Sequence, residues 1–298
     1  MKSFFYLPWW FFKARILGIK RPLQTVLFVS DACNLSCKHC TVYRSTNQHI
    51  KSYEQIKEEL KYSYKLGSRF VDFEGGEPTL WRDGEKDLNS LIRLSKKIGF
   101  YSATITTNAL LPFAGSEADM IWVSLDGIGS YHDDIRGEGV FDRALKHINE
   151  AKHPRISINM VVNNRNYHSV EETIELAKTN PNIQAISLNF HTPYPGTEDL
   201  FLDWDTRAKV IDLIIEKKKA GYPIMNSASG LKLMKHSKFK KECWVTNFIL
   251  ADGSRLPECA GKTADMCNMC GLSMSGEMRS VFSLKPDTVF AGMKLRMR

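Results

Sequence analysis

The chain has 298 residues, 43% of them hydrophobic and 25% charged, and its 41 basic and 33 acidic side chains give a net charge of +8. This ordinary globular composition excludes collagen-like, coiled-coil and wholly disordered proteins. The sequence contains no run of 18 apolar residues, so we expect no helix that crosses a bilayer. The basic excess suits an anionic ligand, a nucleic acid or a membrane surface without choosing among them. Seven cysteines are an odd number, so we expect a reduced, cytoplasmic metal-binding protein rather than a closed disulfide framework.

An aromatic and basic segment occupies residues 1–22. Residues 4–12 hold eight aromatic or aliphatic side chains, including Trp9 and Trp10, and four basic residues follow within 13–21. Tryptophan rings favour the headgroup region of a bilayer, and basic side chains are attracted to anionic lipids. The segment is too short to span, and Pro8 should interrupt a long helix, so we predict peripheral contact with the inner face of a membrane. The alternative is that it packs against the rest of the protein and closes its open side or bottom.

Strand-like and helical patterns alternate from residue 23 onward. Runs rich in β-branched and aromatic residues predict strands at 25–30, 69–74, 102–107, 120–125, 156–162 and 185–190. Amphipathic patterns predict helices between most of them, at 52–66, 86–98 and 140–152, from Ser169 onward, and at 205–220. This alternation implies a parallel sheet, so the sequence predicts an α/β fold with a partial (β/α)6 parallel barrel over 23–220. The alternation of strand and helix patterns ends after Gly221, and we expect residues 221–298 to form a small, irregular, cysteine-rich domain held by metal.

A first group of thiols follows the first predicted strand directly. Cys33, Cys37 and Cys40 lie within eight residues and can converge on one soft metal centre. Three cysteine ligands would leave one iron of a [4Fe–4S] cluster open, free to bind something else. The alternatives are a zinc site, with His39 as a fourth ligand, or chance clustering.

The C-x3-C-x2-C spacing of these cysteines resembles the signature of radical S-adenosylmethionine (radical SAM) enzymes, and the likeness extends over residues 23–220. The resemblance implies that the open iron chelates the amino and carboxylate groups of S-adenosylmethionine. It also implies a flavodoxin- or ferredoxin-like electron donor, whose electron cleaves this cofactor to methionine and a 5′-deoxyadenosyl radical. That radical would remove hydrogen from an unactivated C–H bond of a substrate.

The motif Gly75-Gly76-Glu77-Pro78 ends the second predicted strand. Its glycines allow close backbone approach to a ligand, and its carboxylate can accept a hydrogen bond from an ammonium group, although an ordinary chain reversal is the alternative. The motif is similar to the glycine-rich motif of the family, which holds the methionyl amino group of the cofactor. By that likeness Glu77 assists the contact.

Polar groups also end the later strands, where hydroxyl and carboxylate groups suit ribose hydroxyls and a guanidinium suits a carboxylate. The run from Ser124 to Gly137 looks like the region of peptide-modifying family members in which Ser and Arg contact the cofactor. Leu188 could pack on the adenine, with an ordinary core position as its alternative. The further cofactor-binding candidates are Thr107, Asn108, Ser124, Asp126, Arg136 and Asn159. Capping of strand ends and a surface ion pair are the alternatives for this set.

These motifs all follow predicted strands, and a parallel barrel builds its active site at the C-terminal strand ends. The linker after the last strand should lie over the same mouth. His191 and Tyr194 in this linker are therefore the candidate catalytic residues, although a simple turn would also explain them.

A second group of thiols, Cys243, Cys259, Cys267 and Cys270, lies in the C-terminal segment. Four ligands complete either a zinc site or a second [4Fe–4S] cluster, and inert cysteines are the alternative. The strand–turn sequence of residues 249–259 is similar to the opening of SPASM and twitch auxiliary-cluster domains. Five residues separate Gly253 from Cys259, whereas the longer SPASM-type pattern usually has four. The cysteine count suits a shortened, twitch-like domain with one auxiliary cluster, which could bind substrate, carry an electron or only hold the domain together.

The sequence thus predicts a radical SAM enzyme of unknown substrate. Membrane contact would favour a lipid or membrane-held substrate, and a peptide-modifying maturase is the alternative. A non-catalytic iron–sulfur electron-transfer or binding protein would explain the cysteines but not the Gly-Gly-Glu-Pro motif and the polar strand ends. A nucleic-acid binder is disfavoured, because the basic residues are scattered apart from short runs at 217–219 and 240–241.

Overall fold

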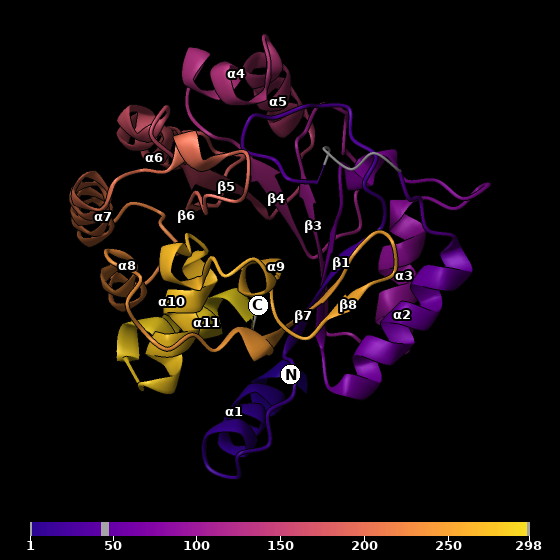
Figure 1. Cartoon of the computed structure of the whole chain (residues 1–298). Coiled ribbons are helices and arrows are strands. Elements are labelled where there is room, and N and C mark those ends of the chain that lie inside the picture. Colours follow the sequence, from indigo (N-terminus) through magenta and orange to yellow (C-terminus); the bar gives the residue numbers. More distant parts are fainter. Residues whose placement is uncertain (1, 43–47, 297–298) are drawn as a thin grey trace.

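The computed structural model describes residues 2–42 and 48–296, and its centre is one curved, open sheet (Figure 1). The strand order is β6-β5-β4-β3-β2-β1-β7-β8, and β1 to β6 pair in parallel with their sequence neighbours. The predicted α/β fold with an open, partial parallel barrel is confirmed. The strands are β1 (Gln24–Phe28), β2 (Phe70–Glu74), β3 (Ser102–Thr107), β4 (Met120–Ser124), β5 (Ile156–Val162), β6 (Ala185–Phe190), β7 (Thr246–Ile249) and β8 (Arg255–Leu256).

Helices cover the outer, convex side of this sheet (Figure 1). They are α2 (Tyr53–Leu66), α3 (Leu88–Ile98), α4 (Ser130–Arg136), α5 (Val140–Glu150), α6 (Val170–Thr179) and α7 (Trp204–Lys219). The predicted helices agree with α2, α3, α5 and α7 to within two residues at each boundary, and the helix predicted from Ser169 onward is α6, which begins at Val170. Ser52 caps α2 by accepting a hydrogen bond from the backbone N–H of Gln55, and Gly67 ends the helix at a positive φ. The short helix α4 was not predicted.

Side chains alternate between the two faces of each strand and thereby separate an apolar from a polar side. Leu27, Phe73 and Ile105 are fully buried in the core between sheet and helices. The positions on either side of Phe73 in β2 and of Ile105 in β3 are polar, and Thr106 lies 3.3 Å from a carboxylate oxygen of Asp72. The concave face therefore offers polar groups to whatever lies within the barrel.

The C-terminal segment is more regular than the sequence predicted. Its strand β7 pairs in parallel with β1 and so continues the sheet beyond six strands. Its helices are α8 (Ala228–Met234), α9 (Ala260–Thr263), α10 (Ser273–Phe282) and α11 (Pro286–Arg296), and the segment covers the opening between β6 and β7 (Figure 1). A Cβ at Gly276 would lie 2.6 Å from the carbonyl oxygen of Gly230, so α8 and α10 approach closely because both carry glycine at their contact. The expectation of an irregular segment is wrong in this respect.

Helix α1 (Lys2–Arg15) packs by one face against the N-terminal edge of the sheet. Trp10 and Ala14 are buried with Phe70 and Phe282, and the indole Nε1 of Trp10 donates to the carbonyl oxygen of Arg21 at 2.8 Å. The predicted interruption at Pro8 is wrong, because α1 continues through it. The predicted headgroup position of Trp10 is also wrong, and the alternative of packing on the barrel is confirmed for this face.

The opposite face of α1 and the residues after it expose large apolar side chains to solvent. Phe5, Trp9 and Phe12 are 72%, 52% and 42% exposed. Ile16 and Leu17 continue this surface beyond the last turn of the helix. None of the helices described is both long and apolar enough to cross a membrane.

Candidate functional site

The first three cysteines lie on the loop that follows β1, at the C-terminal edge of the sheet. Cys33, Cys37 and Cys40 are free thiols. Burial raises the pKa of Cys33, and it raises the pKa of Cys37 to about 11, while Arg136 opposes this rise. Across residues 2–42 and 48–296, no three His, Cys, Asp or Glu side chains converge closely enough to hold one metal ion. Support for a cluster at this loop therefore comes from its three thiols and their spacing.

The two glycines after β2 bring that strand end against the cysteine loop. The backbone N–H of Gly76 donates to the carbonyl oxygen of Ser30 at 2.8 Å. Gly75 has a φ of +152°, and a Cβ there would lie 2.1 Å from the Ser30 oxygen, whereas one at Gly76 would lie 2.2 Å from the Ala32 oxygen. The close approach that these glycines allow is thus to the protein's own backbone, which fixes where the cysteine loop begins. Pro78 follows as the first residue of a 3-10 turn.

Glu77 is buried and joins the ends of β2 and β3. Its carboxylate accepts hydrogen bonds from the backbone N–H and hydroxyl of Thr79, at 3.0 and 2.6 Å. It also accepts from the Thr107 hydroxyl and from the backbone N–H of Asn108, each at 2.7 Å. Burial raises the pKa of Glu77, and these hydrogen bonds oppose the rise. Because four donors from the protein engage this carboxylate, its geometry favours positioning of Thr107 and Asn108 over the expected direct contact with an ammonium group.

Asn108 extends this connection into the cysteine loop. Its side-chain Nδ2 donates to Oδ1 of Asn34 at 2.7 Å and lies 3.9 Å from Sγ of Cys33. Sequence reasoning did not single out Asn34, although its place inside the cysteine motif was a usable signal. Glu77, Asn108 and Asn34 therefore form one chain of hydrogen bonds from the glycine motif to the first cysteine.

A buried ion pair lies on the other side of the loop. The Nε of Arg136, at the end of α4, donates to Oδ2 of Asp126 at 2.7 Å, and its Nη1 lies 3.9 Å from Sγ of Cys37. Oδ1 of Asp126 accepts the backbone N–H of Val161 at 2.8 Å. Burial acts to raise the pKa of Asp126, but Arg136, His39 and His132 outweigh it, so the net pKa is lowered. The pair places a positive charge beside Cys37.

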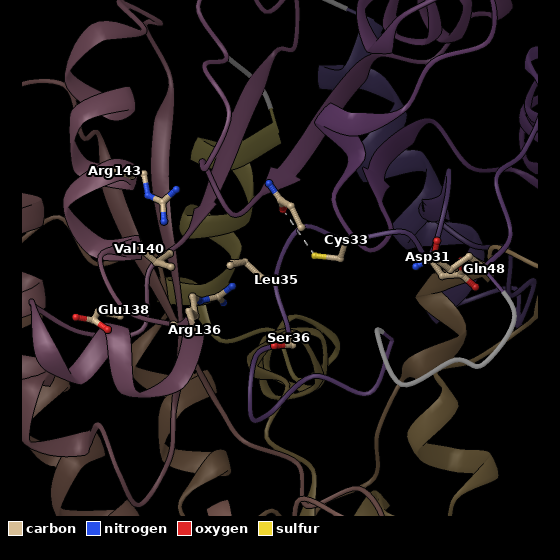
Figure 2. Close-up of a pocket in the computed structure, with 11 residues that line it drawn as sticks. Asp31, Cys33, Leu35, Ser36, Gln48, Arg136, Glu138, Val140 and Arg143 are labelled. Atoms are coloured by element: carbon tan, nitrogen blue, oxygen red, sulfur yellow. Dashed lines mark hydrogen bonds between the residues drawn. The ribbon is translucent and has the colours of Figure 1, made fainter.

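An open cavity of about 530 Å³ lies along this side of the cysteine loop. Figure 2 shows the side chain of Arg136 pointing toward Leu35 and Ser36, with Cys33 on the adjoining stretch of loop. Arg143 of α5 also lines this cavity. One thiol and two guanidinium groups thus border a space that is open to solvent.

A row of polar side chains crosses the concave face. Ser124 lies opposite Asn159 in the register of β4 and β5, and Oδ1 of Asn159 accepts a hydrogen bond from Nδ2 of Asn189 at 2.8 Å. Asn189 in turn accepts from the backbone N–H and hydroxyl of Ser273 on α10. Asn189 and Ser273 were not predicted, although Asn189 lies on the same face as His191, two residues away. The row connects the barrel to the C-terminal segment.

Leu188 does not belong to this row. It is fully buried in the core between the sheet and the helices, and its backbone pairs with the side chain of Asn226. The predicted contact with adenine is wrong, because neighbouring residues of a strand point to opposite faces and Asn189 occupies the concave one.

The four cysteines of the C-terminal segment lie together around one small cavity, which Tyr194, Lys241 and Met266 also line. A hydrogen bond from Cys243 lowers the pKa of Cys259 to about 6 and raises that of Cys243 itself. The antiparallel pair β7–β8 leads into Cys259. Four thiols around one enclosed space are a donor set that suits an iron–sulfur cluster.

The loop after β6 lies between the two groups of cysteines. The ring of His191 is 6.5 Å from the ring of His39 in the first cysteine motif, and its Nε2 lies 3.0 Å from both the carbonyl and the hydroxyl oxygens of Thr197. Burial raises the pKa of Tyr194 to about 12 and lowers that of His39 to about 4. Nε2 of His39 is 3.8 Å from Oδ2 of Asp126, and its Nδ1 is buried with no hydrogen-bond partner among the described residues. His191 thus lies beside the first cysteine motif, and Tyr194 lines the cavity of the second group of cysteines.

The fold and the site together indicate a cofactor-binding protein. It has an open parallel barrel, three cysteines on the first loop and polar groups at the strand ends around that loop. The chain belongs to the Radical SAM superfamily, whose family profile matches residues 27–177. The predicted family is confirmed. Membership implies S-adenosylmethionine and a [4Fe–4S] cluster as cofactors.

Similar proteins bear the names of different enzymes. A probable GTP 3′,8-cyclase of Saccharolobus solfataricus is 31% identical over 172 residues, which cover 53% of this chain and 54% of that protein. An Fe-coproporphyrin III synthase of Methanosarcina barkeri is 27% identical over 217 residues, covering 67% and 52%. The chain therefore spans about half the length of the curated relatives it matches.

The fold resembles that of a solved structure, Streptococcus suis SuiB bound to the precursor peptide SuiA. The TM-score is 0.65 at 19% identity, with 83% of this chain and 61% of that chain covered. This likeness concerns the fold, and it extends beyond the residues that the family profile matches.

Proposed function

We propose that this protein is a radical SAM enzyme that cleaves S-adenosylmethionine reductively and abstracts hydrogen from an unactivated C–H bond of its substrate. The observation that carries the proposal is the cysteine loop with Cys33, Cys37 and Cys40, tied to the Gly75-Gly76 turn in a chain of this superfamily. The chemistry that the bound cofactors supply is one-electron cleavage to methionine and a 5′-deoxyadenosyl radical. A flavodoxin- or ferredoxin-like protein would provide the electron.

The residues around the loop would hold these cofactors. Three thiols suit a cluster with one open iron, and Arg136 offsets the negative charge of a thiolate at Cys37, because Asp126 fixes its orientation. Glu77 would keep Thr107 and Asn108 at the cofactor, while Ser124 and Asn159 offer a hydroxyl and an amide to ribose or substrate. Each of these residues would bind or orient a cofactor or the substrate.

We further propose that Cys243, Cys259, Cys267 and Cys270 hold an auxiliary [4Fe–4S] cluster in a twitch-like domain of residues 221–298. Their common cavity supports this, and so does Lys241 on its wall, because a cluster with four thiolate ligands carries net negative charge. Tyr194 and the row that ends at Ser273 lie between this cavity and the barrel, where a substrate would meet both sites.

The substrate class depends on what approaches the concave face. A peptide is the first candidate, supported by the polar row, whose amides can pair with a peptide backbone, and by a fold similar to that of SuiB. A lipid or membrane-held substrate is the second, supported by the exposed apolar face of α1 with Lys13, whose Nζ lies 4.7 Å from the ring centre of Trp9. Peripheral membrane contact through α1 is thus part of the proposal.

Anaerobic reconstitution with iron and sulfide, followed by reduction with dithionite and addition of S-adenosylmethionine, tests the central claim. We expect 5′-deoxyadenosine and methionine in equal amounts, detected by chromatography. A protein with both clusters reduced that formed neither product would instead be a non-catalytic iron–sulfur protein.

A further inference from the structure

A buried arginine lies directly behind the second group of cysteines. Arg207 of α7 is 0% exposed, and its Nη2 donates to the carbonyl oxygen of Cys270 at 3.0 Å. Aromatic rings flank the guanidinium, whose Cζ lies 4.5 Å from the ring centre of Phe190 and 5.0 Å from that of Trp204. Its Nε and Nη1 have no hydrogen-bond partner in the part of the chain that the structure describes. Two of its three nitrogens are therefore buried and unpaired.

Within residues 2–42 and 48–296, no carboxylate acts on the charge of Arg207. Among the residues that the structure describes, the one ionisable group that acts on this guanidinium is Cys270. A buried charge is costly unless an opposite charge lies near it. Because the backbone of Cys270 contacts this guanidinium directly, a thiolate of Cys270 bound to metal would supply the counter-charge that fits this arginine.

The backbone around Cys270 is held rigidly in front of Arg207. The carbonyl oxygen of Cys270 accepts a second hydrogen bond from the Ser237 hydroxyl at 3.1 Å. Gly271 pairs with β6, because the Phe190 N–H donates to its carbonyl oxygen at 2.8 Å, and a Cβ at Gly271 would lie only 1.7 Å from the Phe190 oxygen. The distance between the guanidinium and the cysteine is therefore fixed by the sheet.

We propose that Arg207 is the counter-charge of the auxiliary cluster, a positioning residue that stabilises the cluster's reduced form and raises its reduction potential. This inference rests on the proposed cluster at Cys243, Cys259, Cys267 and Cys270. One-electron reduction adds a negative charge to the cluster, and a fixed positive charge in a poorly polarisable environment stabilises that added charge. Burial and hydrogen bonds at the ligands are known determinants of such potentials.

The test uses the full chain with Cys33, Cys37 and Cys40 replaced by Ala, so that only the auxiliary cluster contributes. Arg207→Met removes the charge, Arg207→Lys keeps it, and Lys209→Met removes an exposed charge from the same helix as a control. Each protein is reconstituted anaerobically, its iron and circular dichroism are measured, and its cluster is titrated with dithionite while the reduced form is followed by EPR.

At the midpoint potential of the protein with Arg207, we expect Arg207→Met to lower the ratio of reduced to oxidised cluster at least about tenfold, equivalent to about 59 mV for one electron. Arg207→Lys should shift it less, and Lys209→Met should leave it unchanged. Loss of the cluster from folded Arg207→Met but not from Arg207→Lys would also support the counter-charge.

An unchanged ratio in Arg207→Met with full iron, or equal loss of iron from the Met and Lys variants, would overturn the inference. Absence of iron from the background protein that still carries Arg207 would instead refute the auxiliary cluster itself. The two failures are therefore distinguishable.

Discussion

The ring of His191 lies 6.5 Å from the ring of His39, edge to face, so the loop after β6 contacts the first cysteine motif. Three residues later, Tyr194 lines the cavity of the second group of cysteines. One short loop thus borders both proposed clusters. A change in either cysteine group should alter the position of this loop. A substrate bound beside the loop would be close to both proposed clusters.

The two groups of cysteines should hold separate clusters. Fully loaded protein should contain about eight irons, and replacing Cys33, Cys37 and Cys40 by Ala should reduce this to about four and abolish formation of 5′-deoxyadenosine. Replacing the four C-terminal cysteines should remove the other four irons, so each variant serves as the control for the other. Full iron and full cleavage in the first variant would contradict the assignment of the first site.

Removal of the charge at Arg136 should weaken binding of S-adenosylmethionine about ten- to a hundredfold, because a charge-assisted hydrogen bond contributes roughly 1.5–3 kcal/mol. Arg136→Ala also leaves Asp126 buried without its partner, so the free energy of unfolding should fall by about 3–5 kcal/mol. Equilibrium dialysis and chemical denaturation measure the two effects. Arg143→Ala, an exposed arginine at the same cavity, is the control. Wild-type affinity in a folded Arg136→Ala protein would exclude a role in binding.

Glu77→Ala should weaken cofactor binding to a similar degree, although we infer that Glu77 does not touch the cofactor. Its loss leaves the Thr107 hydroxyl and the Asn108 N–H unpaired, at about 1–3 kcal/mol for each buried group. The expected signature is a lower melting temperature together with a raised Kd, measured on cluster-loaded protein. Exposed Glu85→Ala should change neither. A raised Kd at unchanged stability would instead indicate direct contact with the cofactor.

The sequence predicted the sheet well because each strand is a short apolar run bounded by turn residues. The face that a residue occupies follows from the alternation of apolar and polar side chains along its strand, where that alternation is present. In β6, Leu188 stands between polar Ser187 and Asn189, so the prediction of Leu188 at the cofactor overlooked a signal that the sequence carried. In β1, the consecutive residues Val26, Leu27 and Phe28 are all apolar, so the sequence alone could not show which face each of them occupies.

Two other features were hidden for different reasons. Helix α10 has few apolar residues and contains Gly276, so no amphipathic period predicted it, and its contact with α8 depends on glycine rather than on large side chains. Arg207 lies on a helix that was predicted, but its burial follows from the placement of Cys270, which is 63 residues away in sequence. Such long-range pairings have no local signal.

Stability should depend on pH through Glu277 of α10. Burial raises the pKa of this carboxyl to about 7, while its Oε1 accepts the backbone N–H of Ser227 at 2.8 Å. The unfolded chain has a glutamate pKa of about 4.3, so the folded state holds the proton more tightly. The protonated Glu277 carboxyl therefore contributes fully to the free energy of unfolding below pH 4, and this contribution is lost as the pH rises through about 7. Glu277→Gln cannot ionise and keeps the acceptor.

The variant Glu277→Gln should thus gain stability relative to wild type between pH 5 and pH 8, by roughly 2–4 kcal/mol at the upper end. Chemical denaturation at both pH values measures this difference. Exposed Glu216→Gln should show no such trend. A constant difference between Glu277→Gln and wild type at both pH values would mean that Glu277 ionises normally in the folded protein.

The exposed face of α1 should bind anionic vesicles. Phe5, Trp9 and Phe12 can enter the headgroup region, while neighbouring Lys13 and Arg15 face the lipid charge at about 1 kcal/mol each. Deleting residues 1–22 would not test this cleanly, because Trp10 and Ala14 belong to the core and their loss destabilises the fold.

Substitution of the outer face alone avoids that difficulty. Full-length protein should float with phosphatidylserine-containing vesicles in a density gradient, less so at high salt, and the variant Phe5→Ser/Trp9→Ser/Phe12→Ser should remain at the bottom while keeping its circular dichroism. The matched control replaces two exposed apolar residues on other parts of the molecule, Ile50→Ser and Leu80→Ser, and should float like wild type. Wild-type protein that does not float, or a triple variant that floats equally well, would refute membrane contact through α1. A peptide would then be the remaining candidate substrate, since the lipid alternative depends on this surface.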